Sequence, residues 1–176
     1  MLRYLAVFLA LSAPAWAQGV IGCDGWQASA RNIAEPWDRH SRLFANGAIR
    51  VTLLDTVEPA AGAFYLMVLA PPYDDLGGRN CGIVGEGDGS IGFAGLFFDQ
   101  MDAAYDPARG LTLRAPVSRI APSTGGFDPA ILAVTIDQAA GTITPVFETP
   151  EARVRRCESY GNHMRFIRES YAPIRG

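Results

Sequence analysis

The stretch Asp106–Val117, DPARGLTLRAPV, joins a tight turn to a strand and decides the fold class. Proline at the second position presets φ for a type I turn, and the closing glycine supplies positive φ at the turn exit. After the glycine, every second residue is apolar, which is the pattern of a strand with one buried face. This unit predicts an antiparallel hairpin.

The same turn plan recurs at Glu58–Gly62 and Asp137–Gly141, where an acid opens the turn and glycine closes it. Asn46-Gly47 and the glycine-rich segment Gly85–Gly89 add two further turns between apolar segments. About eight strands result, in hairpin pairs and without alternation of helices and strands. The sequence therefore predicts a mainly β fold, an antiparallel sandwich or barrel.

Three further segments complete the expected fold. Phe64–Leu69 is continuously apolar, which predicts a central strand covered on both faces or a strand at an interface. Ile91–Phe98 is expected as the strand that follows the glycine-rich turn. Between residues 23 and 38, Trp26, Ile33 and Trp37 are expected to fill the core.

The C-terminal region has a different pattern. Thr149–Glu151 is typical of a helix start, with threonine as N-cap and proline at the first helical position, and Gly161 is a plausible stop. Met164, Ile167 and Tyr171 then recur at helical spacing. The sequence predicts one or two short C-terminal helices packed on the sheet.

Residues 1–17 have the order of a cleavable signal peptide: Arg3, the apolar run Tyr4–Leu11 and the small-x-small pattern Ala15–Ala17. The apolar run is shorter than the roughly 20 residues that span a bilayer, and no later run is long enough. We expect cleavage after Ala17. Residues 18–176 would then form a single β-rich domain, periplasmic or secreted, without a transmembrane helix.

A second cleavage site competes with the first. Val20–Cys23 resembles a bacterial lipobox, in which the cysteine is lipidated and becomes the mature N-terminus. Pro14 and Gln18-Gly19 separate it from the apolar run, a layout that favours cleavage after Ala17. Lipidation of Cys23 would give a membrane-anchored lipoprotein with a scaffolding role.

The chain has three cysteines, Cys23, Cys81 and Cys157. Exported proteins keep disulfides, and an odd count leaves one thiol unpaired. If Cys23 carries lipid, Cys81 pairs with Cys157; without lipid, all three pairings are open. Cys81–Cys157 is possible with or without lipid on Cys23, so it is the pairing that we expect. The cysteines fit no zinc spacing, and no metal or cofactor is predicted.

Charge limits the classes of partner. The formal net charge is −3, and without Arg3 it is −4, with 14 arginines against 18 acidic residues. This balance argues against nucleic acid, whose phosphates require a basic surface. The chain contains no lysine, which excludes lysine-based catalysis.

No catalytic residue is assigned, and the balance of the sequence is against an enzyme. His40 lies near Glu35, Asp38 and Ser41, but there is no Gly-x-Ser-x-Gly elbow, and adjacent residues on a strand point to opposite faces. An exported hydrolase built from dispersed residues is the alternative. It requires a pocket where His40 or His163 approaches a carboxylate or hydroxyl.

The expected ligand site is a polar cluster at one end of the sheet, because loops at sheet ends commonly bind ligands. Its residues are Asp74, Asp75, Arg79, Glu86 and Asp88. The leading functional hypothesis is an exported, non-catalytic β-domain that binds a small ligand or an envelope protein.

Overall fold

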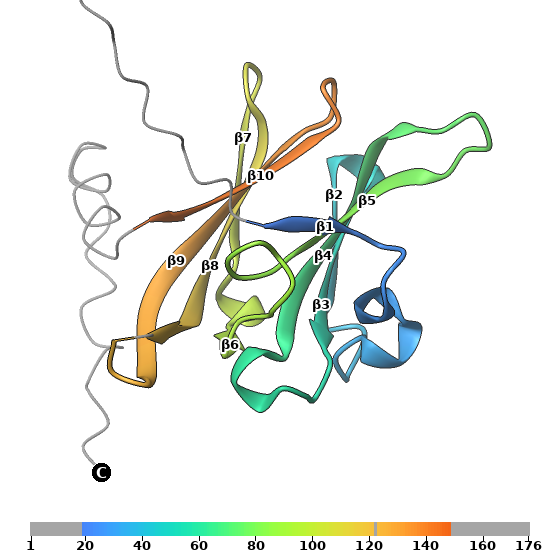
Figure 1. Ribbon diagram of the computed structural model, residues 1–176. Helices are drawn as coiled ribbons and strands as arrows, with labels where there is room; N and C mark the ends of the chain where they lie inside the picture. The colour runs from blue at the N-terminus through green and yellow to red at the C-terminus, as the bar shows by residue number, and fades with distance from the viewer. Residues whose placement is uncertain (1–18, 122, 149–176) are drawn as a thin grey trace, which may run out of the picture.

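The computed structural model describes residues 19–121 and 123–148, and its strands form two antiparallel sheets (Figure 1). Sheet 1 has the order β1-β5-β4-β3-β2. Its strands are β1 (Val20–Gly22), β2 (Ser41–Phe44), β3 (Ile49–Asp55), β4 (Phe64–Tyr73) and β5 (Arg79–Val84).

Sheet 2 has the order β10-β9-β8-β6, with β7 also paired to β8. Its strands are β6 (Gly95–Leu96), β7 (Asp102–Asp106), β8 (Gly110–Ala121), β9 (Gly126–Asp137) and β10 (Thr142–Glu148). The described residues contain no α-helix. Their helical turns are short 3₁₀ segments: η1 (Trp26–Ala28), η2 (Ala30–Asn32), η3 (Ala45–Gly47), η4 (Ala60–Gly62) and η5 (Phe98–Gln100).

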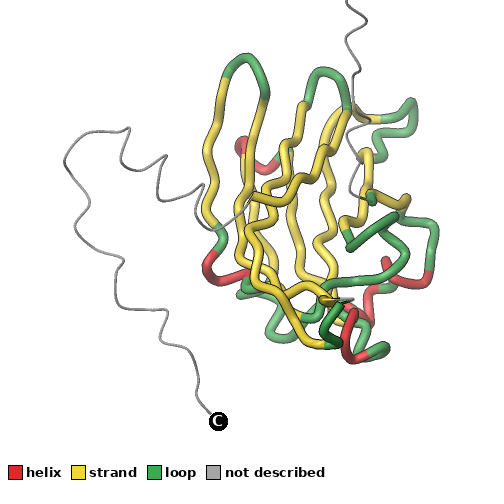
Figure 2. Tube along the Cα trace, turned by 60° about the vertical axis from the view of Figure 1, so that its left-hand side comes forward, coloured by secondary structure: helices red, strands yellow, loops and turns green. Residues whose placement is uncertain are grey.

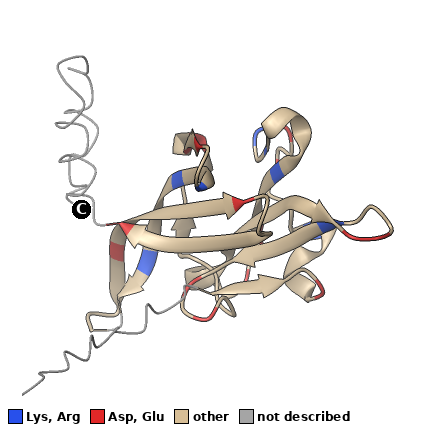
Figure 3. Cartoon of the chain, turned by 90° about the horizontal axis from the view of Figure 1, so that it is seen from above, with Lys and Arg blue, Asp and Glu red and all other residues tan. Residues whose placement is uncertain are grey.

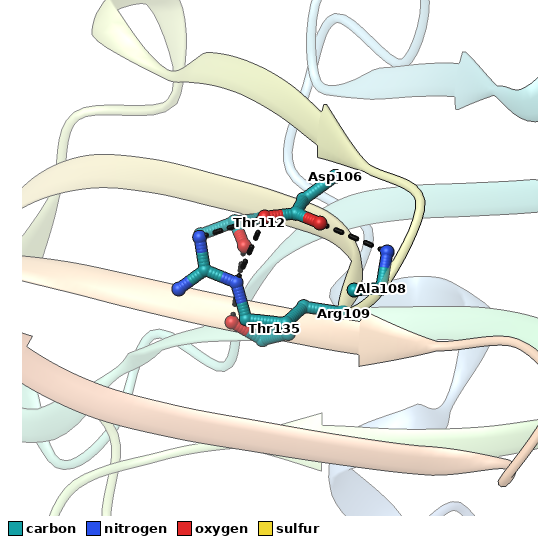
Figure 4. A network of polar contacts seen from close by, with 5 residues as sticks. All are labelled: Asp106, Ala108, Arg109, Thr112 and Thr135. Atoms are coloured by element: carbon teal, nitrogen blue, oxygen red, sulfur yellow. Dashed lines mark hydrogen bonds and ion pairs between the residues drawn. The ribbon is translucent and has the colours of Figure 1, made fainter.

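The turn at Asp106–Gly110 joins β7 to β8 as expected, and its acid holds it closed (Figure 4). The Asp106 carboxylate accepts hydrogen bonds from the backbone N–H of Ala108 at 2.9 Å and from the Arg109 guanidinium at 2.8 Å. The turns at Glu58–Gly62 and Asp137–Gly141 and the Asn46-Gly47 turn also join antiparallel strands. The hairpin prediction is confirmed at these four turns.

The glycine-rich segment differs from the expectation. Of the predicted strand Ile91–Phe98, only Gly95–Leu96 forms a strand, and it pairs with β8 of the other sheet, whereas Ile91 and Phe93 form isolated β-bridges with Glu86 and Phe64. After these short bridges the chain crosses to sheet 2 and forms no continuous strand beside β5. Phe93 and Phe98 are buried in the core between the sheets, which explains why this apolar segment does not form a regular strand.

The two sheets share one core, and they lie side by side in Figure 1, while Figure 2 shows that strands make up most of the described chain. Alternate residues of the central strands supply this core: Ile49, Val51, Leu53, Leu66 and Val68 from sheet 1, and Leu111, Leu113, Leu132, Val134 and Ile136 from sheet 2. The described strands form no closed barrel, because β1 and β10 are the edges of separate sheets. Of the two expected architectures, two packed sheets are compatible with a sandwich.

Strand β4 is central in sheet 1 and covered on both faces, as its apolar run predicts. Leu66 faces the shared core, whereas Tyr65 packs in a second cluster with Leu54 and Ile83. Partly buried residues before β2, including Ile33, cover this second cluster.

Two tryptophans in the same N-terminal region do not fill the core as expected. Trp26 is 53% exposed and Trp37 is 55% exposed, whereas Ile33 packs against the second cluster. Small residues and 3₁₀ turns bring the backbone close to sheet 1, since Ile33 forms a β-bridge with Leu54. Ile33, which the bridge holds against the sheet, therefore supplies the apolar contact, and the two indole rings lie largely in solvent.

The disulfide joins Cys23 to Cys81, not Cys81 to Cys157 as expected, and its Cα atoms are 5.7 Å apart. The register of β1 and β5 explains the pairing, because Gly22 lies opposite Gly82 and the next pair of residues is therefore the two cysteines. Cys157 lies outside the described residues. One sulfur atom cannot hold a disulfide and a lipid thioether, so this bond and lipidation at Cys23 exclude each other.

The predicted C-terminal helices fall in residues 149–176, outside the described part of the chain. Within the part that is described, no helix has the length and apolar character needed to cross a membrane.

Candidate functional site

The structure does not bring the predicted polar cluster together. Asp74, Asp75 and Arg79 lie at the β4–β5 turn, whereas Glu86 and Asp88 follow the other end of β5. The six residues of β5 separate the two groups by about 20 Å. Figure 3 accordingly shows acidic residues spread over separate loops.

The polar groups at the β4–β5 turn serve the local structure. Asp74 accepts hydrogen bonds from the backbone N–H groups of Leu76 at 2.9 Å and Gly78 at 2.6 Å. The Arg79 guanidinium donates to the carbonyl oxygen of Gly47 at 3.3 Å. The Asp74 contacts stabilise its own turn, and the Arg79 contact joins that turn to the β2–β3 turn.

Glu86 is also structural, although it lies in the glycine-rich loop. It is 8% exposed and accepts hydrogen bonds from Arg119 Nε at 3.0 Å and from the N–H of Ile120 at 3.3 Å. The Arg119 guanidinium lies 3.7 Å from the centre of the Phe147 ring. This ion pair anchors the loop to sheet 2 and covers the edge of the core.

Asp88 is exposed in the same loop. The Ser90 hydroxyl and the Ser90 N–H donate to its carboxylate and hold the pKa of Asp88 below its usual range. Its carboxylate closes a short turn. Among the described residues, no contact joins Asp88 to Arg119.

The structure has a better candidate elsewhere, a cleft of about 480 Å³ where residues 31–40 meet β3, β4 and β6. This volume is typical of small-molecule sites, which are mostly apolar with a few polar groups. Leu53 and Leu96 are buried and form its base. The other lining residues are Arg31, Ile33, Ala34, Glu35, His40, Asp55, Val57 and Phe64.

Backbone hydrogen bonds hold one wall of the cleft against β3. The N–H of Ala34 donates to the Leu53 carbonyl at 3.0 Å, and the N–H of Leu53 donates to the His40 carbonyl at 2.9 Å. His40 Nδ1 lies 3.2 Å from the Ala34 carbonyl oxygen, to which only an N–H can donate. In the neutral ring, Nε2 is then the unprotonated nitrogen and can accept a hydrogen bond.

Asp55 ends β3 at the rim of the cleft. Its Oδ1 accepts a hydrogen bond from the N–H of Val57 at 2.9 Å, and Oδ2 has no hydrogen bond to any described residue. Val57 is 72% exposed and has φ of 68°, which is unfavourable for a β-branched residue. Backbone strain of this kind is concentrated at binding and catalytic sites.

The arrangement suits binding of an amphipathic molecule, with hydrocarbon on the base and a polar group at the rim. Within residues 19–121 and 123–148, no group of three or more His, Cys, Asp or Glu side chains is placed to hold a metal ion. A second hollow of about 170 Å³, lined by β1, β5 and the start of β10, is below the usual size of a ligand site.

Sequence reasoning identified His40 and Glu35 as neighbours but missed this cleft. Asp55 and Val57 carried no signal beyond their place after a strand, and Leu96 was expected in a hairpin. The cleft depends on the crossing from sheet 1 to sheet 2, which no local pattern predicts.

The chain matches no protein-family model, no curated protein and no solved structure.

Proposed function

We propose that this protein is an exported, non-catalytic β-domain that binds a small amphipathic molecule in the cleft beside His40 and Asp55. The observation that carries the proposal is the cleft itself, with its apolar base and charged rim. The N-terminal pattern of residues 1–17 supports export. The Cys23–Cys81 disulfide is compatible with an oxidising compartment.

Cleavage after Ala17 is the proposed route to the mature protein. It leaves Cys23 inside the chain, where the sulfur is available for the disulfide. In the lipoprotein alternative the Cys23 sulfur carries a lipid and cannot form the disulfide. The intact mass of the protein from membrane and soluble fractions distinguishes the lipidated form from the disulfide-bonded form.

The proposed function is tested by NMR titration of the disulfide-bonded protein, cleaved after Ala17, with hexylammonium, hexanol and hexanoate. Binding in the cleft should shift backbone resonances of residues 31–40 and 53–57 and leave those of the 74–78 turn unchanged. If none of the three compounds shifts the cleft resonances, the proposal is wrong. Specific capture of one envelope protein, with no small-molecule binding, would instead support the alternative of a protein partner.

A hydrolase is the second candidate, because His40 lines the same cleft as Glu35 and Asp55. A base at Nε2 of His40 could activate water if a carboxylic ester bound beside it. The measurement is hydrolysis of short p-nitrophenyl esters by the wild type and by His40→Ala. The binding proposal expects equal background rates, whereas a rate that depends on His40 would establish an enzyme.

A further inference from the structure

We infer that the cleft selects a cationic amphiphile, an alkyl- or arylammonium, over neutral or anionic molecules of the same size. This inference rests on the proposed binding function and names the class of ligand. It is based on the charges of the residues that line the cleft and on the absence of ion pairs between them and other described residues.

The lining carries two carboxylates, Glu35 and Asp55, against the single guanidinium of Arg31. None of the three forms an ion pair with a described residue. The surroundings are acidic as well, because residues 19–148 contain eight arginines and fifteen acids. An ammonium group that enters this cleft is therefore attracted at short range and by the wider field.

The carboxylate of Asp55 is held in place more firmly than the guanidinium of Arg31. Asp55 is fixed at the end of β3 by the N–H of Val57, which engages Oδ1 and leaves Oδ2 for a ligand. Arg31 is exposed and has a long side chain, so its guanidinium can turn into water without breaking an ion pair to a described residue. A cation thus meets a preorganised carboxylate, whereas an anion must order an exposed arginine side chain.

The apolar lining also suits a cation attached to hydrocarbon. Phe64 is partly buried in the cleft wall, and an aromatic ring attracts a nearby ammonium group. Leu53 and Leu96 give the base on which a hydrocarbon body would lie. The site therefore combines an acidic anchor with an apolar floor.

The test compares the dissociation constants of hexylammonium, hexanol and hexanoate, measured by the NMR titration at pH 7. Hexylammonium should bind about tenfold more tightly than hexanol, the factor that corresponds to one charge-assisted hydrogen bond. Asp55→Asn keeps an acceptor for the Val57 N–H but removes the charge, so it should abolish most of this preference. Asp75→Asn is the matched control, an exposed acid on the β4–β5 turn at the other end of the sheets.

The outcomes separate this inference from the proposed function. Cleft binding of hexanol as tight as that of hexylammonium overturns the charge selectivity and leaves the proposed function standing. Equal loss of preference in Asp55→Asn and Asp75→Asn also overturns it, because the general field would then do the selecting. If Asp55→Asn does not fold, Glu35→Gln at an exposed position replaces it, and an unchanged preference in that variant contradicts the inference.

Discussion

The two ends of the sheets place similar acidic residues in different surroundings. At the turn end, which carries the 74–78, 106–110 and 137–141 turns, each opening aspartate accepts hydrogen bonds from backbone N–H groups of its own turn. At the loop end, which carries the connections after β3 and β5, Asp55 accepts the same kind of hydrogen bond, from the N–H of Val57, but it also lines the cleft. A carboxylate that closes a turn can therefore meet a ligand only where neighbouring segments form a cleft beside it.

The comparison shows why the residues of the predicted polar cluster do not gather in one place. Asp74 and Asp75 are acids of a polar loop, but Asp74 accepts hydrogen bonds from its own turn and neither residue lines the cleft. The cleft lies at the loop end, where segments from both sheets and the N-terminal region meet.

The largest expected effect comes from the covalent bond that holds β1 to β5 near the turn end. Replacing both Cys23 and Cys81 by serine should lower the free energy of unfolding by about 4 kcal/mol, because the bond closes a long loop in the unfolded chain. Urea denaturation measures the loss. Cys157→Ser is the control and should change nothing; a comparable loss there would show that Cys157 is paired instead.

A smaller effect is expected from the buried acid at the loop end. Glu86→Gln should lower the free energy of unfolding by about 2 kcal/mol, because Arg119 loses its partner beside the core. Thermal and urea unfolding provide the measurement. Asp88→Asn changes an exposed acid in the same loop and should cost much less. Equal losses in the two variants would mean that the loss of stability comes from disturbing the loop and not from breaking the ion pair.

The smallest effect is a pH dependence at the turn end. The N–H of Ala108 and the Arg109 guanidinium hold the pKa of Asp106 below its ordinary 3.8. A lowered folded-state pKa stabilises the protein above pH 3.8, and this contribution is lost as the pH falls through the folded value. Asp106→Asn should therefore melt slightly below the wild type at neutral pH, and the difference should shrink below pH 3.8.

Melting temperatures from pH 7 to pH 2 test this prediction, with Asp75→Asn as the control on a neighbouring turn. A difference between Asp106→Asn and the wild type that stays constant to pH 2 would contradict it, since the charge would then play no part.

Much of the fold was predictable from local pattern. The turn at Asp106–Gly110 and its relatives have residues that fix φ and satisfy backbone groups within five positions. The continuous apolar run of β4 indicated a strand with two buried faces. The local pattern predicted the wrong structure where a segment can bury its apolar residues in more than one way. Ile91–Phe98 buries them by crossing into the shared core.

The candidate site was predictable only in fragments. Glu86 looked like a loop acid, but Arg119, 33 residues later, makes it part of the structure. Asp55 looked like the end of a strand, but residues 31–40 fold back over β3 and make it part of a cleft. In both cases the segment that decides the role of the acid is distant in sequence, so the residues around the acid do not predict that role.

The sequence by itself determined the turns, the alternation of the strands and the mainly β class, because these depend on backbone geometry and burial over a few neighbouring residues. Tertiary structure alone decided which cysteine Cys81 meets, which acids are buried and where a cleft opens. Those outcomes depend on the register of strands and on the crossing between sheets, which bring together residues that are distant in the chain.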